Sequence, residues 1–429
     1  MLCPLMARSV LALWTCAVRS YAADVCNWEA RDAPVLAPKA NRAAIIGKEC
    51  AEDADGMWAC PSSATGASVP ASEFGALGPR GLIVSGGTLY AVDEMNHRVT
   101  KTVLTTALDA LGTGSTVVAG ETGAPSFSGV LTKLAYPRDI AIASDGSILV
   151  TDAGNGRVVR VEQVAAGQDL PAAVVIAGGN GPGAEYDQFA ANPVGLAYDS
   201  GDDSVYVADT MNHRVLKFAC STSTGTLVCS TTGSLVAGKC TGDAGAVSCT
   251  AGSGLDELNQ PKGIAVRAGT VYIADEENHR VLKCSSPSTC TVIAGGNGEG
   301  DGENQLTEPS GVFVTSSGTV YIADTQNHRI VKLSGSVVTI VVPDVCIKEN
   351  APHVNCAGHS GPKQLWAPSD VNVVGDLIYI SDSKNRRIVV YCESVAPESK
   401  ITSHAAAAWS GAWLVLGLVS TMLGGPSLF

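Results

Sequence analysis

Basic residues recur at one repeated position of the chain, where they could bind an anionic group. The position directly follows a proline and has six copies, held in chain order by Arg80, Arg138, Val194, Lys262, Ser310 and Ser369. Because the chain is otherwise acidic, with a net charge of −13, the three cations Arg80, Arg138 and Lys262 predict a ligand site for a carboxylate, sulfate or phosphate. The alternative is that they stay solvated or pair with Asp139 and Asp370.

Catalytic and metal chemistry has fewer candidates. Four of the seven histidines, His97, His213, His279 and His328, stand at the same place of a repeated phrase, which indicates a structural role. The sequence has no Gly-x-Ser-x-Gly elbow, His-Glu-x-x-His pair or Walker loop. We therefore predict no catalytic residue, no metal ligand and no cofactor.

The phrase that carries these residues occurs six times. Its copy at residues 271–284 reads VYIADEENHRVLKC, and the other copies keep the aspartate, asparagine and arginine. The six aspartates are Asp93, Asp152, Asp209, Asp275, Asp324 and Asp382. Each unit opens at a proline, and its β-branched and aromatic runs, separated by glycine turns, predict four short strands. Asp and Asn side chains suit the turn, and the arginine can pair with the aspartate of its own or an adjacent unit.

This phrase resembles the NHL repeat, and the resemblance covers residues 41–391. It implies an all-β fold, a six-bladed β-propeller. Two copies depart from the usual histidine, with Gly156 in the second unit and Arg386 in the sixth. The last unit ends after its third strand, while residues 43–47 read as a fourth strand without its first three. We expect this N-terminal strand to complete the last blade, because closure removes the open sheet edge.

The cysteines predict an oxidising compartment. The chain has 14 cysteines, and a secretory signal peptide at residues 1–23 would remove Cys3 and Cys16, leaving an even number. Their placement suggests two hairpin clips, three linker loops and one bond that locks the ring. The expected pairs are Cys220–Cys229, Cys284–Cys290, Cys50–Cys60, Cys240–Cys249, Cys346–Cys356 and Cys26–Cys392.

The remaining segments predict how the chain is displayed. We expect an N-terminal extension at residues 24–41, the propeller at 42–392, a polar spacer at 393–404 and an apolar tail at 405–429. The tail fits a GPI-attachment signal, with a transmembrane anchor as the alternative. The protein is then secreted or held at the cell surface through its tail, with the corners and inter-blade linkers on the face that points outward.

These features favour a non-enzymatic binding or adhesion scaffold. The partner is a protein, or an anionic glycan or peptide, and the acidic charge argues against nucleic acid. We expect a monomer. The alternative is a secreted metal-dependent lyase or hydrolase with its site in the propeller channel. Few inner-strand residues are available as its ligands: Asp139, Asp370 and Asn372, with Asp199 at a strand end.

Overall fold

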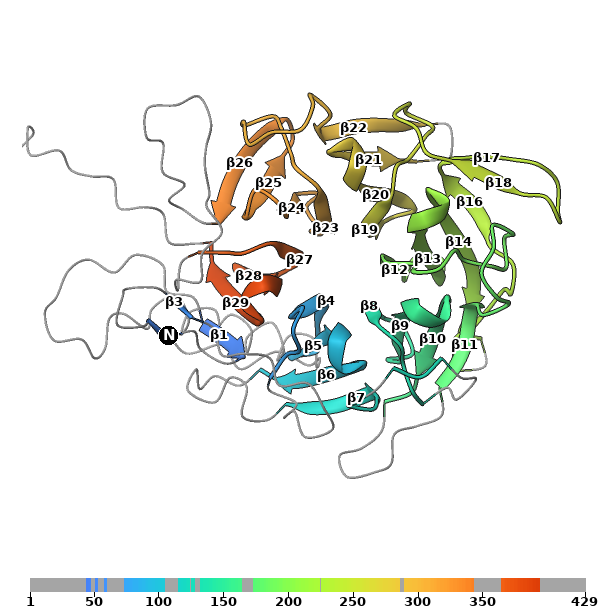
Figure 1. Ribbon diagram of the computed structural model, residues 1–429, viewed down its shortest axis with the longest axis horizontal. Coiled ribbons are helices and arrows are strands. Elements are labelled where there is room, and N and C mark those ends of the chain that lie inside the picture. The colour runs from blue at the N-terminus through green and yellow to red at the C-terminus, as the bar shows by residue number, and fades with distance from the viewer. Residues whose placement is uncertain are drawn as a thin grey trace, which may run out of the picture. The chain divides into compact units, whose positions relative to one another are not determined.

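The computed structural model describes residues 44–47, 51–52, 58–59, 73–104, 115–123, 125–127, 132–163, 173–223, 225–285, 289–342 and 364–393. Their strands form six small antiparallel sheets, the blades, arranged around a common centre (Figure 1). The predicted six-bladed propeller is confirmed.

The first three blades follow one another in chain order. Blade 1 contains β4 (Pro79–Ser85), β5 (Thr88–Asp93), β6 (Arg98–Val103) and β7 (Thr116–Gly120). Blade 2 contains β8 (Pro137–Ile142), β9 (Ile148–Asp152), β10 (Arg157–Val161) and β11 (Ala173–Gly178). Blade 3 contains β12 (Leu196–Asp199), β13 (Ser204–Asp209), β14 (Arg214–Ser221), β15 (Val228–Cys229) and β16 (Ser234–Ala237).

The last three blades complete the ring. Blade 4 contains β19 (Pro261–Arg267), β20 (Thr270–Asp275), β21 (Arg280–Cys284) and β22 (Cys290–Gly295). Blade 5 contains β23 (Pro309–Val314), β24 (Val320–Asp324), β25 (Arg329–Ser334) and β26 (Val337–Val342). Blade 6 contains β27 (Pro368–Val374), β28 (Leu377–Asp382), β29 (Arg387–Cys392) and β1 (Ala44–Gly47). Two short hairpins, β2 (Ala51–Glu52) with β3 (Trp58–Ala59) and β17 (Lys239–Thr241) with β18 (Ser248–Thr250), lie outside the blades.

The first and last blades close the ring as the sequence predicts. Strand β1 pairs antiparallel with β29, Ala44 opposite Val390 and Gly47 opposite Arg387. The innermost strands contact one another in the cyclic order β4, β8, β12, β19, β23, β27 and back to β4. Apolar side chains of blade 1 and blade 6, including Leu82 and Tyr379, share one buried cluster. Because each blade packs both faces against its neighbours, the second strands are apolar without alternation, and every residue of β13 is buried.

A triad of Asp, Asn and Arg, the corner triad, with its Asp and Arg buried, holds the turn between the second and third strands of each blade. In blade 5, Asp324 Oδ2 accepts hydrogen bonds from Asn327 Nδ2 at 2.9 Å and Arg329 Nε at 2.6 Å. The guanidinium also donates to the carbonyls of Asp301, Gly302 and Gln305 in the linker before the blade. The arginine therefore pairs with the aspartate of its own blade, in all six blades.

The corner histidines join neighbouring blades. All four have a left-handed backbone, and His97, His213 and His279 directly follow a short 3-10 helix, as His213 does after η5 (Thr210–Asn212). The Nδ1 atom of His213 accepts a hydrogen bond of 3.1 Å from the backbone N–H of Gln260, which precedes the proline of blade 4. His97, His279 and His328 make the equivalent bond to Tyr136, Glu308 and Ala367. Their Nδ1 atoms thus serve the fold.

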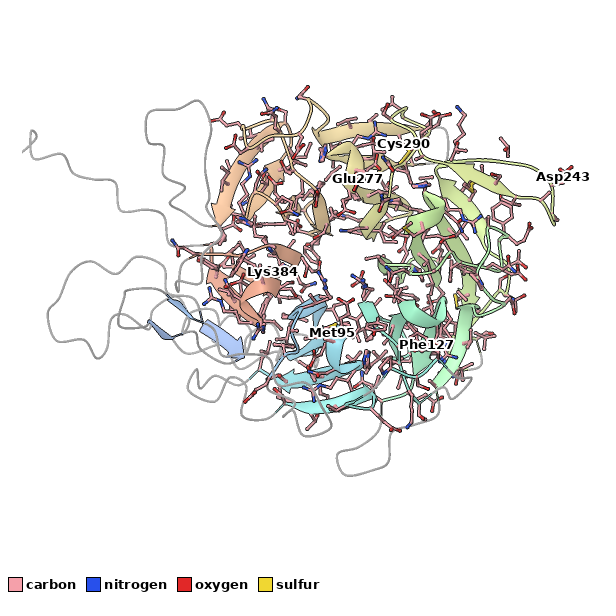
Figure 2. The ribbon with its side chains drawn as sticks, in the orientation of Figure 1. Met95, Phe127, Asp243, Glu277, Cys290 and Lys384 are labelled. Carbon is pink, nitrogen blue, oxygen red and sulfur yellow. A yellow bond between two sulfur atoms is a disulfide. The ribbon has the colours of Figure 1, made fainter. Side chains whose placement is uncertain are left out.

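The two faces of the ring differ in their loops. The corners, the starts of the innermost strands and the β17–β18 hairpin lie on one face, because Pro79 pairs with Asp93 and β16 ends opposite Val215. Figure 2 labels Met95, Glu277 and Lys384 at three corners and Asp243 on that hairpin. The chain enters β1 on the opposite face, at the end of the sheet where β29 finishes.

Three of the expected disulfides are present, Cys220–Cys229, Cys240–Cys249 and Cys284–Cys290. Each joins directly opposed residues of an antiparallel pair, and together they indicate an oxidising compartment. The side chains of the other expected pairs, Cys26–Cys392, Cys50–Cys60 and Cys346–Cys356, lie outside the described residues, as do the signal peptide, spacer and tail.

Candidate functional site

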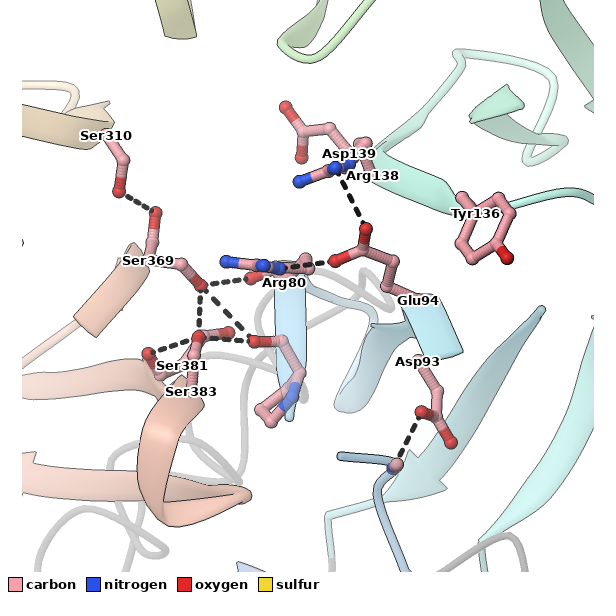
Figure 3. Close-up of polar contacts among 12 residues, drawn as sticks. Arg80, Asp93, Glu94, Tyr136, Arg138, Asp139, Ser310, Ser369, Ser381 and Ser383 are labelled. Carbon is pink, nitrogen blue, oxygen red and sulfur yellow. Dashed lines mark hydrogen bonds and ion pairs between the residues drawn. The ribbon is translucent and has the colours of Figure 1, made fainter. Parts of the chain in front are cut away.

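The six residues that follow the prolines meet at one end of the central channel. They line a single hollow, the mouth pocket, on the corner face of the ring (Figure 3). The pocket also includes Asp139 and Asp370 from the next position of β8 and β27, and Thr325 from the corner of blade 5. The structure therefore brings together Arg80, Arg138 and Lys262, which the sequence places up to 182 residues apart.

Two arginines from neighbouring blades share one buried carboxylate. Arg80 Nε donates to Glu94 Oε2 at 2.6 Å, and Arg138 Nη2 lies 2.9 Å from Glu94 Oε1 (Figure 3). Glu94 is 2% exposed, whereas Arg80 and Arg138 are 28% and 22% exposed. Burial lowers the pKa of Arg138 and the charge of Glu94 raises it, and a guanidinium stays protonated at physiological pH. One carboxylate thus fixes two cations side by side, with one positive charge in excess.

The third cation of the pocket has its own partner. Lys262 Nζ bonds Glu276 Oε1, and burial raises the pKa of Glu276. The alternative that the cations pair with Asp139 and Asp370 is therefore wrong. Those carboxylates bind backbone instead: Asp139 Oδ2 accepts from Leu196 N of blade 3, and Asp370 Oδ2 accepts from Leu82 N of blade 1, both at 2.8 Å.

The position after the repeat aspartate supplies these partners, and our sequence reasoning missed it. It is held in chain order by Glu94, Ala153, Thr210, Glu276, Thr325 and Ser383. Where it carries a hydroxyl, that group donates to the proline carbonyl of the next blade, as Thr325 does to Pro368 at 2.8 Å and Ser383 to Pro79 at 2.6 Å. Three blades carry a cation after the proline, and in two of them, blades 1 and 4, a glutamate takes the place of the hydroxyl. This pairing of cation and glutamate in the sequence could have revealed the contact.

The pocket is therefore divided into two arcs. At the position after the proline, blades 1, 2 and 4 contribute a cation, whereas blades 5 and 6 contribute a hydroxyl. Ser310 Oγ donates to the carbonyl of Ser369 at 2.7 Å, and Ser369 Oγ lies 2.6 Å from Ser383 Oγ. The hydroxyl arc is saturated by such bonds. The arginine arc is not: among the described residues, no partner is found for Arg138 Nε, which is buried.

The acidic residues considered for the channel alternative are held by backbone amides. Asp139 and Asp370 also accept from Ile140 N and Val371 N, Asn372 Oδ1 accepts from Val84 N, and Asp199 accepts from Gly201 N and Gly269 N. In the part of the chain that the structure describes, no group of three or more His, Cys, Asp or Glu side chains is placed to hold a metal ion.

Comparison with known proteins agrees with this geometry. The model of the NHL repeat matches residues 134–160, 191–218, 258–284 and 306–333, which correspond to the first three strands of blades 2 to 5. The chain is an NHL-repeat β-propeller. A search of curated protein sequences found no match. Within the described ranges of this NHL propeller, no helix is long and apolar enough to cross a membrane.

Solved structures show the same fold at low identity. An auxiliary nutrient binding protein from Bacteroides ovatus is 11% identical, with a TM-score of 0.51 over 82% of this chain and 77% of that one. A virginiamycin B lyase from Staphylococcus aureus is 11% identical, with a TM-score of 0.42 over 74% of this chain and 95% of that one. A gluconolactonase from Xanthomonas campestris is 12% identical, with a TM-score of 0.45 over 74% and 86%. The NHL propeller shares the fold of the auxiliary nutrient binding protein.

Proposed function

We propose that this NHL propeller is a secreted or cell-surface, non-enzymatic binding scaffold that holds an anionic group of a peptide or glycan in its mouth pocket. The observation that carries the proposal is the pair Arg80 and Arg138. Two guanidiniums from different blades are held side by side by Glu94, yet Arg138 Nε and both terminal nitrogens of Arg80 have no partner among the described residues. A carboxylate, sulfate or phosphate would accept paired hydrogen bonds from the terminal nitrogens of Arg80, beside the partly exposed guanidinium of Arg138.

The surroundings support an anion rather than a cation at the rim. Arg80, Arg138 and Lys262 share the two carboxylates Glu94 and Glu276. Asp139 and Asp370 also line the pocket, but backbone N–H groups are their partners and burial raises their pKa values. The site lies on a rigid ring, so the arginines need little reorganisation to bind. Linkers on the same face, including the β17–β18 hairpin clipped by Cys240–Cys249 at the outer edge of the ring (Figure 1), would give a larger ligand further contacts.

The placement outside the cell rests on the disulfides and on the predicted terminal segments. Three bonds within the propeller fit a secreted domain. An apolar tail after blade 6 would attach the face opposite the mouth to the membrane, since the chain leaves β29 at that face. The mouth pocket would then point away from the cell.

The test is titration of the purified protein without the predicted signal peptide and apolar tail, residues 24–404, which keeps both Cys26 and Cys392, with a sulfated oligosaccharide and with a glutamate-rich peptide. Arg80→Gln combined with Arg138→Gln should abolish binding of the anion, whereas Lys283→Gln, which removes an exposed cation on β21, should leave it unchanged. Glu94→Gln should tighten binding, because it removes the charge that opposes the anion. Unchanged binding when Arg80→Gln and Arg138→Gln are combined would contradict the proposal. Weaker binding in Glu94→Gln with the fold intact would contradict it as well.

A further inference from the structure

A second hollow adjoins the mouth pocket along the channel. This channel cavity has a volume of ≈ 160 Å³ and is lined by the middle of the innermost strands, with apolar side chains such as Ile142, Val266 and Phe313. Asp139 and Asp370 are the residues that line both hollows. Cavities of about 150 Å³ accommodate a molecule of the size of benzene.

Glycines in the other blades explain why Asp139 and Asp370 are the side chains that lie between the two hollows. At the position of Asp139 and Asp370, the other four innermost strands carry glycine. A Cβ atom on Gly81 would lie 2.7 Å from the Cα atom of Asp139, and one on Gly311 would lie 2.6 Å from the Cα atom of Asp370. Such approaches exclude side chains there. The two aspartates are therefore the side chains that this tight ring admits.

The polar groups of the cavity gather near these aspartates. Asn372, two residues after Asp370 on β27, lines the cavity and is 6% exposed. Its Oδ1 accepts from Val84 N at 3.3 Å, whereas its Nδ2 donor has no partner among the described residues. Each aspartate oxygen accepts one backbone N–H, which leaves acceptor capacity on both carboxyls.

Charge distinguishes this cavity from the mouth. Among the described residues that line it, the ionisable acids are Asp139 and Asp370, and none is a lysine, arginine or histidine. Removal from water raises the pKa of Asp139 to about 7, and burial together with repulsion from Asp139 raises that of Asp370. The charged groups that face the aspartates from the mouth are Arg80, Arg138 and Lys262, each next to Glu94 or Glu276.

We propose that the channel cavity binds a small apolar amine or alcohol, whose headgroup donates to Asp139 and Asp370 and whose body fills the apolar channel. A hydroxyl would donate to a carboxylate and accept from Asn372 Nδ2, and an ammonium would donate to both carboxylates. An anion has no cationic partner in the cavity, so burying it there is unfavourable. The site is separate from the anion site of the mouth, and it does not depend on that proposal.

The test compares benzylamine, benzyl alcohol and benzoate, which share a ring and differ in charge, by calorimetry and ligand-observed NMR on the intact propeller. Saturable binding of the amine or the alcohol, with benzoate weaker by about tenfold or more, is expected. Benzylamine affinity should fall between about pH 8 and about pH 5 as the carboxyls take up protons, while benzyl alcohol affinity should change less. Equal binding of benzoate, or no saturable binding of any of the three, would overturn the proposal.

Variants separate the cavity from the rest of the ring. Asp370→Asn should weaken benzylamine by about tenfold or more. Asp199→Asn is the matched control, because Asp199 also accepts backbone N–H groups of its own and the next blade but does not line the cavity. If Asp370→Asn does not fold, Ala265→Leu fills the cavity while keeping both carboxyls, and it should remove binding of amine and alcohol. Binding that survives Ala265→Leu, or that falls equally in Asp199→Asn, contradicts the assignment. Loss of anion binding in the Arg80 and Arg138 variants would not affect these outcomes.

Discussion

The corner triad of blade 5 and the mouth pocket both pair arginine with a buried carboxylate, yet the mouth leaves arginine donors without a partner among the described residues. In blade 5, Asp324 is 0% exposed and Arg329 1% exposed, and the guanidinium is saturated by the carboxylate and three carbonyls. At the mouth, Glu94 is equally buried, but Arg80 and Arg138 face a pocket with donors to spare. The same ion pair is therefore structural at the corner, whereas at the mouth we propose that it also binds a ligand.

The largest effect should come from removing a corner arginine. Arg329→Met leaves Asp324 charged, buried and without its cation, which should cost about 3–5 kcal/mol of unfolding free energy. Arg80→Met, at the mouth, should cost about 1 kcal/mol or less, because Glu94 keeps Arg138 and the side chain is partly solvated. Urea unfolding of both variants, followed by circular dichroism, measures the difference. Similar losses of unfolding free energy in the two variants would contradict the distinction between a structural corner arginine and a mouth arginine that the fold does not need.

A smaller effect should come from a corner histidine and should depend on pH. His213→Ala removes the acceptor for Gln260 N and should cost about 1 kcal/mol. Burial lowers the pKa of His213 in the folded state. Its contribution is therefore complete above the ordinary value of about 6.5 and is lost as the pH falls below it, since the unfolded chain takes up the proton more readily.

The measurement is urea unfolding of wild type and His213→Ala across this range. The gap between the two should narrow as the pH falls from about 7.5 to about 5.5. A gap that widens on acidification would show that the charged form stabilises the joint instead. Blade 2 makes its joint to blade 3 with Gly156 at the histidine position, so loss of one such bond is compatible with the fold.

The fold was predictable because its signal is repeated, whereas the partners at the mouth depend on how blades meet. Six copies of one phrase, with a spare strand at residues 43–47, determine the number of blades and the closure through β1. The convergence of Arg80, Arg138 and Lys262 follows from the same symmetry. The role of Glu94 as the shared partner of two arginines was not predicted, because Arg138 belongs to the next blade and the contact forms only when the blades pack together.

The alternative that the cations pair with Asp139 and Asp370 failed for a similar reason. Adjacent charges in the sequence, Arg138 with Asp139, suggest a pair, but consecutive residues of a strand point to opposite sides. Asp139 therefore turns toward the amides of blade 3, while Arg138 reaches back to Glu94 of blade 1.

The smallest effect on stability should come from adding a cation to the mouth pocket in a blade that has no glutamate after its repeat aspartate. Val194 of blade 3 lines the pocket and is partly exposed, and the position after its repeat aspartate is Thr210, whose hydroxyl donates to Pro261 O. Val194→Lys should change the unfolding free energy by about 0.5 kcal/mol or less, because the new ammonium can remain in water. It should nevertheless strengthen binding of a sulfated oligosaccharide, since it adds unpaired positive charge to the pocket, and Val194→Gln serves as the uncharged control. If Val194→Lys and Val194→Gln bind alike, unpaired charge at the mouth does not govern binding there, and the contrast with the corner triads is one of exposure alone.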